Sequence, residues 1–225
     1  MKTFKSPRAK LNRIPSRGYY DEETIFDILD AGFLCHVAFY MDGSPHLIPT
    51  AYGRKGKTVF LHGSAKSRML CHLATGAPAA IAVTHIDGIV LARSSFHSSM
   101  NYRSAVLYGS GMEITETQEK MEALEIVSES IMPGRWEEAR KPTTNELTAT
   151  TVVAFHIEEG SAKIRTGPPS DDTADELLDI WAGVLPVAPA YGDAIRDANL
   201  RDHIGFPKSL ENFVDKHNRF RKSID

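Results

Sequence analysis

The most informative part of the sequence is FLCHVAFYMDGSPHLIPTAYGRKGKTVFLH, residues 33–62. Its first eight residues are aromatic and apolar, and the Asp42-Gly43 pair that follows them is a strong hairpin signal. Residues 46–52 return as a second strand-like segment, and a basic turn leads into a third at 58–62. This part of the chain therefore predicts three short strands, the first two joined as a hairpin.

The same strand pattern continues along the chain, with few helices between the strands. Further strands are expected at 79–85, 89–92, 103–114 and 150–157, the first two separated by another turn signal, Asp87-Gly88. Helices are expected within 21–32, 64–76, 115–133 and 207–221. Six or so short strands with a few inserted helices predict a mainly β protein, a small β-barrel with helices, rather than a doubly wound α/β sheet.

Composition excludes several classes of protein. The chain has 225 residues, 42% hydrophobic and 24% charged, with a formal net charge of −3, which fits one domain with extensions. The balanced charge disfavours nucleic-acid binding, and every apolar stretch is shorter than the ~20 residues of a membrane span. The basic N-terminus has no apolar region typical of a secretory signal. Two cysteines are too few for a disulfide framework, so a cytoplasmic location is expected.

The segment 61–69 carries the parts of a phosphate site. It combines hydroxyls, two cations and free backbone N–H groups where a predicted strand meets a predicted helix. Ser64 and Ser67 can donate their hydroxyls, and Arg68 can hold two phosphate oxygens at once. The alternative is an ordinary helix capped by Ser64 or Ser67, with solvated cations.

Two further segments are rich in groups that need partners. Residues 94–104 contain five serines together with His97, Asn101, Tyr102 and Arg103 and run into an apolar strand. The alternative is a solvated loop in which Arg103 pairs with a surface acid. In the third segment, 45–52, Pro49 lies inside a predicted strand, which places it at an edge or bulge and leaves neighbouring backbone groups free for a planar ligand. It can equally mark a simple edge strand.

Several common motifs are missing. The nine histidines show no metal-ligand spacing and the cysteines form no C-x-x-C, so no metal site is expected. Neither dinucleotide-binding nor P-loop glycine motifs occur, and there is no G-x-S-x-G. A nucleotide-like ligand must therefore be held in some other way.

Taken together and in this order, these residues resemble the pyridoxamine 5'-phosphate oxidase-like family of FMN-binding split barrels, in particular its nitroimidazole-resistance branch. The resemblance covers roughly residues 15–160. The residues that carry it are Arg17 to Asp21, Leu34 to Val37, Ile48 to Thr50, His62 to Ser64, Ser67 to Met69, Val90 to Ser94, His97, and Asn101 to Ser104 with Gly109.

The resemblance implies a fold and an assembly. It implies a six-stranded antiparallel split barrel with Greek-key connectivity, working as a homodimer with one FMN in each of two clefts between subunits. The implied organisation is an N-terminal arm over residues 1–16, the FMN-binding domain over 17–160, and a C-terminal extension over 161–225 packed on the barrel.

The resemblance also implies the cofactor-binding residues. Ser67 and Arg68 match the residues that hold the FMN phosphate, with Ser64 beside them, and His62 and Gly63 match the strand end beside the flavin. The strand facing the ring edge is matched by Ile48, Pro49 and Thr50; the strand reaching the partner subunit's cofactor is matched by Tyr102, Arg103 and Ser104, next to Asn101 and His97. Met69 replaces a third cation of the true oxidases, and their C-terminal Arg-x-His motif is missing. Both departures argue against pyridoxamine phosphate as the substrate.

The expected function is an FMN-dependent oxidoreductase that acts on a small organic substrate, with nitroaromatic compounds among the candidates. His62 is the expected proton donor, with His97 second, and Trp181 is expected to stack on the flavin or to anchor the extension. The alternatives are a non-catalytic flavin-binding or sensing protein and a haem-binding or haem-degrading barrel with an axial histidine such as His85 or His217. FAD or the deazaflavin F420 are less favoured than FMN.

Overall fold

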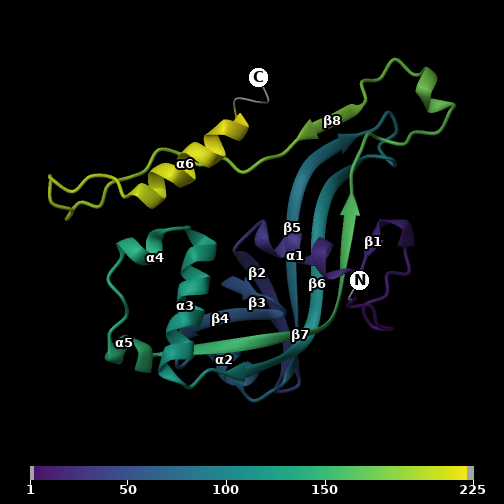
Figure 1. The fold of residues 1–225 in the computed structure, drawn as a ribbon. Coiled ribbons are helices and arrows are strands. Elements are labelled where there is room, and N and C mark those ends of the chain that lie inside the picture. The colour runs from purple at the N-terminus through teal and green to yellow at the C-terminus, as the bar shows by residue number, and fades with distance from the viewer. Residues whose placement is uncertain (1–2, 222–225) are drawn as a thin grey trace.

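The computed structural model describes residues 3–221, and from His217 onward only the backbone. The elements run in the order η1 (Pro15–Arg17), β1 (Gly18–Tyr19), α1 (Glu22–Asp30), β2 (Leu34–Met41), β3 (Ser44–Lys55), β4 (Thr58–Ser64), α2 (Arg68–Ala74), β5 (Pro78–Leu91), β6 (Ser99–Glu113), α3 (Thr117–Ile131), α4 (Arg135–Glu138), α5 (Thr144–Thr148), β7 (Thr150–Arg165), η2 (Asp175–Leu177), β8 (Gly183–Pro186) and α6 (Lys208–Arg221) (Figure 1). No helix in this part of the chain has the length and apolar character needed to cross a membrane.

Six antiparallel strands close into a ring. Their order is β7-β4-β3-β2-β5-β6, and β6 pairs back onto β7 over most of its length. The short strands β1 and β8 add to β7 and β5. The prediction of a mainly β, six-stranded antiparallel split barrel is therefore confirmed.

The interior of the barrel is filled by alternate residues of its strands. Val37, Leu61, Ile81 and Phe155 are among the fully buried side chains of this core, and α1 and α2 pack their own apolar faces against it. The Tyr52 hydroxyl donates to the Leu29 carbonyl and thereby ties β3 to α1. Each such side chain contributes about 1.5–3 kcal/mol when it leaves water, so the ring is stabilised without any ligand.

Helix α3 covers the outer side of β3 and β4. A second apolar cluster forms beneath it, with Ala123 and Leu124 of the helix against Phe60 and Val152 of the strands. The helix comes so close that a Cβ on Gly53 would lie 2.6 Å from the Ile126 carbonyl oxygen. Glycine at this position is therefore what permits the contact.

The two Asp-Gly pairs adopt different structures. Asp42 and Gly43 have φ of 50° and 75°, the left-handed conformation of a tight hairpin turn, as predicted. The prediction of a second turn at Asp87-Gly88 is wrong, because β5 continues through this pair with only a register shift. The Asp87 carboxylate is held by Arg103 of the neighbouring strand, with nitrogen–oxygen distances of 3.0 and 2.8 Å, which keeps the two strands paired across the bulge.

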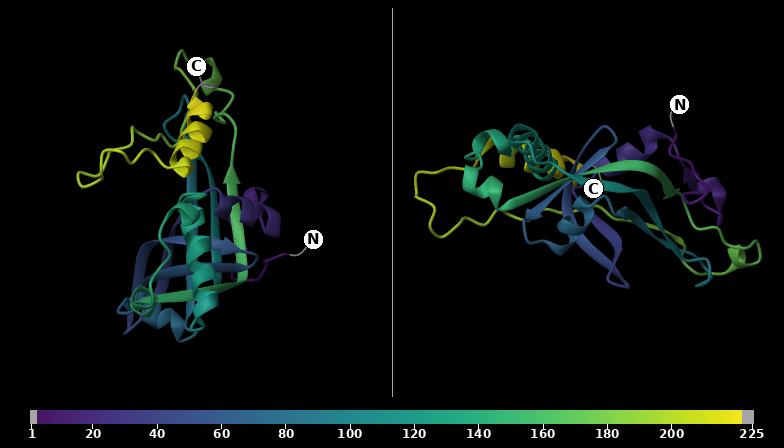
Figure 2. Two further views of the ribbon diagram at one scale, coloured as in Figure 1. Left: turned by 60° about the vertical axis from the view of Figure 1, so that its left-hand side comes forward. Right: turned by 90° about the horizontal axis from the view of Figure 1, so that it is seen from below.

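The far halves of β5, β6 and β7 rise beyond the barrel as a curved ribbon (Figures 1 and 2). Strand β7 continues past residue 160 to Arg165, and β8, within the apolar stretch after Trp181, pairs with the end of β5. Asp171 ties the loop after β7 to the loop after β5. Its nearly inaccessible carboxylate accepts from the backbone N–H groups of Arg93 and Ser94, at 3.0 and 3.4 Å, and from the Arg93 guanidinium.

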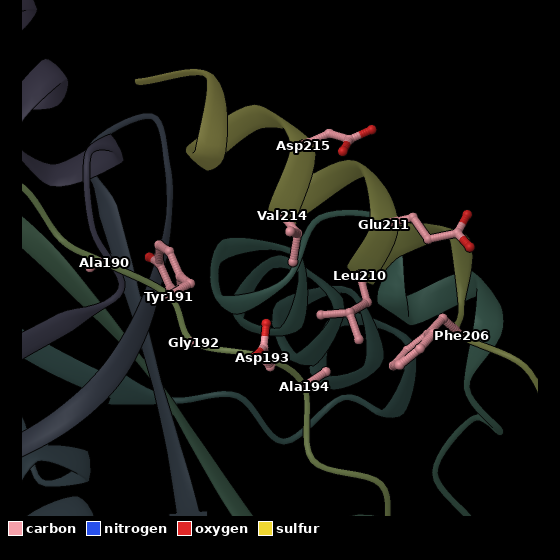
Figure 3. Close-up of a pocket in the computed structure, with 10 residues that line it drawn as sticks. All are labelled: Ala190, Tyr191, Gly192, Asp193, Ala194, Phe206, Leu210, Glu211, Val214 and Asp215. Atoms are coloured by element: carbon pink, nitrogen blue, oxygen red, sulfur yellow. The ribbon is translucent and has the colours of Figure 1, made fainter. Parts of the chain in front are cut away.

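The C-terminal segment returns from the ribbon toward α3 and α4 and ends in α6 (Figure 1). Ser209 donates its backbone N–H and its hydroxyl to the Glu138 carboxylate, which fixes the start of α6 against α4. Residues 190–194 and α6 enclose a cavity of about 660 Å³, whose walls include Tyr191 and Leu210 (Figure 3).

Candidate functional site

The ring of strands is open along one seam, between β3 and β4. The two strands pair only from Tyr52 and Leu61 to the tight turn that joins them. Before Tyr52, β3 pairs with β2 alone, and after Leu61, β4 pairs with β7 alone. The backbone edges of residues 44–51 and 62–64 therefore face an open seam, where N–H and C=O groups are free to meet a ligand.

The predicted residues Ile48, Pro49 and Thr50 lie on one side of this seam. They pair in register with Val37, His36 and Cys35 of β2. Pro49 is exposed, as a proline on a strand with one free edge can be, whereas Ile48 is half-buried and packs against the core. Cys35 is fully buried.

The predicted phosphate residues lie where the other side of the seam ends. Ser67 is the N-cap of α2, its hydroxyl oxygen accepting from the Leu70 N–H at 3.4 Å, and the Ser64 hydroxyl accepts from the Lys66 N–H at 3.2 Å. Arg68 is exposed, and none of the residues whose side chains are described forms a hydrogen bond or ion pair with its guanidinium. The helix-cap interpretation is thus correct for Ser67, and it leaves the hydroxyl hydrogens and Arg68 free for an anion.

His62 and Gly63 connect the seam to the layer of helices outside it. They pair with Val152 and Thr151 of β7, so their other backbone edge faces β3 across the seam. The His62 ring is half-buried on the side covered by α3, where its Nδ1 atom is inaccessible to solvent and has no partner among the described residues. Burial lowers the pKa of His62 below its usual 6.5, so the ring is neutral at pH 7.

A second group of predicted residues lies on the ribbon rather than at the seam. Tyr102 and Ser104 belong to β6 where it pairs with β5 and β7, and the Ser104 hydroxyl donates to the Lys163 carbonyl at 3.3 Å. Arg103 is paired with Asp87, whose hydrogen bonds raise the pKa of the guanidinium. In this chain Arg103 thus has the acidic partner that the alternative interpretation expected.

The remaining predicted residues occupy the far part of the ribbon. Asn101 is buried and donates to the Gly167 carbonyl at 3.1 Å while accepting from Arg165. His97 lies 3.5 Å from Asp172, and Trp181 is 67% exposed. Within the single chain, therefore, the structure brings together residues 48–50, 62–64, 67 and 68, and leaves His97, Asn101 to Ser104 and Trp181 apart from them.

Two groups of residues were not predicted from the sequence. One is a group of possible metal ligands, His97, Asp172 and Asp175, whose ligand atoms lie within 4.8 Å of one another on the distal loops. The other lines a cavity of about 260 Å³ beside His62 and comes from α3, α4, α5 and the loops between them. No spacing motif marks either set, because their members meet only through the tertiary fold.

The histidines proposed as axial haem ligands do not both remain available. His85 Nε2 lies 2.9 Å from the Ile28 carbonyl oxygen, which occupies the nitrogen that a haem iron would need. The side chain of His217 lies outside the described residues. His36, which sequence analysis did not consider for this role, is exposed on the outer face of β2 beside Leu34 and Leu47, which are 53% and 63% exposed.

A ring of antiparallel strands that is interrupted at one seam and filled by a hydrophobic core defines a split β-barrel. Residues 21–164 match the family model described as pyridoxamine 5'-phosphate oxidase. The chain therefore belongs to the pyridoxamine 5'-phosphate oxidase family, as its motifs indicated. Comparison with curated proteins finds no match.

Solved structures extend this similarity over most of the chain. The chain is 34% identical to the flavocytochrome Anf3 from Azotobacter vinelandii, with a TM-score of 0.86 over 92% of this chain and 96% of that one. It is 37% identical to the FAD- and haem-binding protein from Mycobacterium smegmatis, with a TM-score of 0.83 over 87% and 96%. A putative 5-nitroimidazole antibiotic resistance protein from Bacteroides thetaiotaomicron shares the fold, at 20% identity and a TM-score of 0.54 over 65% and 86%.

Proposed function

We propose that this protein binds a flavin in the seam between β3 and β4 and uses it to reduce or oxidise a small organic substrate, with nitroaromatic compounds as the first class to test. The observation that carries the proposal is the meeting of two unpaired strand edges with the unpaired cation Arg68 in one corner of the fold. These groups fit a flavin, whose ring has hydrogen-bonding edges and whose side chain ends in a phosphate.

Each part of this corner has a role in the proposal. Ser67 and Arg68 hold the phosphate, and the free backbone groups of residues 48–50 and 62–64 orient the ring. A bound flavin supplies the transfer of electrons between a donor and the substrate. Because burial lowers the pKa of His62, its ring rests neutral, and its protonated form is a stronger acid than an exposed histidine.

The smallest cofactor that satisfies this site is FMN, because the site has a single phosphate-binding corner. FAD has the same half-molecule, and the M. smegmatis relative is described as an FAD-binding protein. The first test is the absorbance spectrum of the purified protein, followed by release and mass identification of the bound molecule. A released flavin supports the proposal, whereas a colourless protein that does not take up added FMN or FAD would contradict it.

We propose further that the protein is a homodimer through its ribbon. Ile89 of β5, Met100 of β6 and Leu185 of β8 lie directly opposite one another, and they are 44%, 48% and 57% exposed. Such an apolar row is suited to a second copy of the chain, which would also place the Tyr102–Ser104 segment near the partner's seam. A monomer in light scattering that still retains flavin would refute this arrangement.

A second candidate function is the binding of haem together with flavin. Two relatives above 30% identity are described as a flavocytochrome and as an FAD- and haem-binding protein. In this chain the exposed, apolar surroundings of His36 fit an axial ligand better than the occupied ring of His85. Loss of a Soret band in His36→Ala, with the flavin bands unchanged, would support this candidate; a protein that shows no Soret band after haem is added would exclude it.

A further inference from the structure

A cavity of about 260 Å³ opens on the outer side of His62. Its walls come from the end of β4, the start of β7, helix α3 and the segment 132–149, in the form of His62, Leu124, Ser128, Trp136, Arg140, Pro142, Glu146 and Thr150. Thr150 pairs with Ser64 across β4 and β7, and Ser64 lies next to the predicted phosphate residues. The cavity therefore adjoins the flavin corner rather than some remote surface.

His62, which lines the cavity, carries a polar ring atom without a partner. His62 Nδ1 is inaccessible in this structure and forms no hydrogen bond with any described residue. A buried polar nitrogen left without a partner is costly, and such groups usually meet water or a ligand. Since the neutral imidazole can act as donor or acceptor, depending on its tautomer, this nitrogen can bind either kind of group.

The opposite wall is held rigidly by hydrogen bonds. The Glu129 carboxylate accepts from the backbone N–H groups of Gly134 and Trp136, at 2.6 and 2.9 Å. Lys141 lies over the Trp136 ring, with Nζ 4.7 Å from its centroid, and donates to the Trp136 carbonyl at 2.6 Å. A wall fixed in advance in this way loses little entropy when a ligand binds.

The charges around the cavity cancel. Arg140 and Glu146 form a two-point ion pair with nitrogen–oxygen distances of 2.9 and 2.7 Å. These hydrogen bonds, with those from Thr143, lower the pKa of Glu146 to about 2, so its carboxylate is ionised at neutral pH. The cavity thus offers no net positive charge for a phosphate, in contrast to the corner at Arg68.

We propose that this cavity binds an uncharged, planar nitrogen heterocycle that stacks on Trp136, and that the His62 ring turns to bring its Nδ1, inaccessible in this structure, into a hydrogen bond with it. Its aromatic and apolar walls and the Ser128 hydroxyl fit such a ring, and the Thr150 oxygen can accept from it while the Thr150 hydroxyl donates to the Glu146 carbonyl at 2.8 Å. Its volume lies below the range of about 300–1,000 Å³ typical of pockets for whole drug-sized ligands, so it takes one ring system. This inference rests on the proposed flavin function, because the ring is either the adenine of FAD or a separate aromatic substrate beside FMN.

The test uses Trp136 as its own reporter. The chain has two tryptophans, so a Trp181→Phe background leaves Trp136 as the single source of indole fluorescence. The full-length apoprotein is titrated with FMN and with FAD, and the FMN-loaded protein with adenine and with 2-nitroimidazole. Binding constants for Trp136→Leu and Trp136→Phe, which cannot report by fluorescence, come from calorimetry. Thr144→Ala, an exposed change in the same segment, is the matched control.

We expect Trp136→Leu to weaken binding of the heterocycle about five- to 150-fold, the range for stacking of a base on an aromatic side chain, and Trp136→Phe to restore most of it. If only FAD binding weakens, with FMN binding and thermal midpoint unchanged, the ring is adenine. If adenine or 2-nitroimidazole binding to the FMN-loaded protein weakens instead, the ring belongs to a separate substrate. Unchanged binding of all these probes would overturn the inference, whereas failure of the wild-type protein to bind FMN and FAD would overturn the flavin proposal itself.

Discussion

Replacing Arg68 with alanine should weaken the binding of the cofactor without changing the stability of the fold. The guanidinium is exposed and forms no hydrogen bond or ion pair with the described side chains, and the helix cap at Ser67 does not depend on it. The variant should therefore keep the thermal midpoint of the wild-type apoprotein. Loss of a charge-assisted hydrogen bond to phosphate costs about 1.5–3 kcal/mol, which corresponds to about a 10- to 150-fold increase in the dissociation constant of FMN.

The matched control is Lys66→Ala, which removes an exposed cation two residues earlier. Lys66 precedes the helix cap, and in our assignment its charge acts on the phosphate only through solvent. That loss is about 0.2–1 kcal/mol, as for other exposed charge pairs, and its effect shrinks with added salt. Both dissociation constants are measured by quenching of flavin fluorescence. Equal effects of the two substitutions, or an unchanged constant for Arg68→Ala, would refute the assignment of Arg68 to the phosphate.

Three further expectations concern the fold around this site. Gly53→Ala forces a methyl group against the backbone of α3, so urea denaturation should show a loss of about 1–3 kcal/mol or more; an unchanged midpoint would mean that the helix does not pack this closely. Burial raises the pKa of the Cys35 thiol to about 12, so a thiol reagent should modify Cys71 alone until denaturant is added. Because burial lowers the pKa of His62 below 6.5, the unfolded chain binds its proton more tightly. The wild type should therefore lose stability relative to His62→Gln as pH falls from 7.5 through the folded-state pKa, and parallel pH profiles would contradict this.

The local sequence predicted the positions of the strands well, but it predicted the connections between them less well. Asp42-Gly43 and Asp87-Gly88 are the same dipeptide between apolar segments, yet only the first is a hairpin turn. The difference comes from Arg103, which is 16 residues beyond Asp87 and binds its carboxylate across the strands. A dipeptide signal contains no information about such a partner, so the long uninterrupted β5, and the ribbon that it builds, could not be read from the local pattern.

Some residues of the candidate site could likewise be predicted from the local sequence, and others could not. Ser67 and Arg68 were predictable because a strand end and a helix start are adjacent in sequence, and both lie where the pattern placed them. The cavity beside His62 was not, because Trp136 and Thr150 reach it only after α3 has packed across β3 and β4. A hint was present in the turn residues Pro133 and Gly134, which follow α3 and reverse the chain into α4.

The open seam also determines how ligand binding relates to folding. Elsewhere the ring is closed by backbone pairing and filled by a buried core, so the seam exists before any ligand arrives. A planar ligand that binds there meets strand edges already fixed by β2 and β7, and little chain entropy is lost. A flavin should therefore stabilise the protein only by mass action, by about 2.7 kcal/mol at a free concentration 100 times its dissociation constant. If the edges of β3 and β4 became ordered only on binding, calorimetry of flavin binding would instead show a large unfavourable entropy and a large negative heat-capacity change.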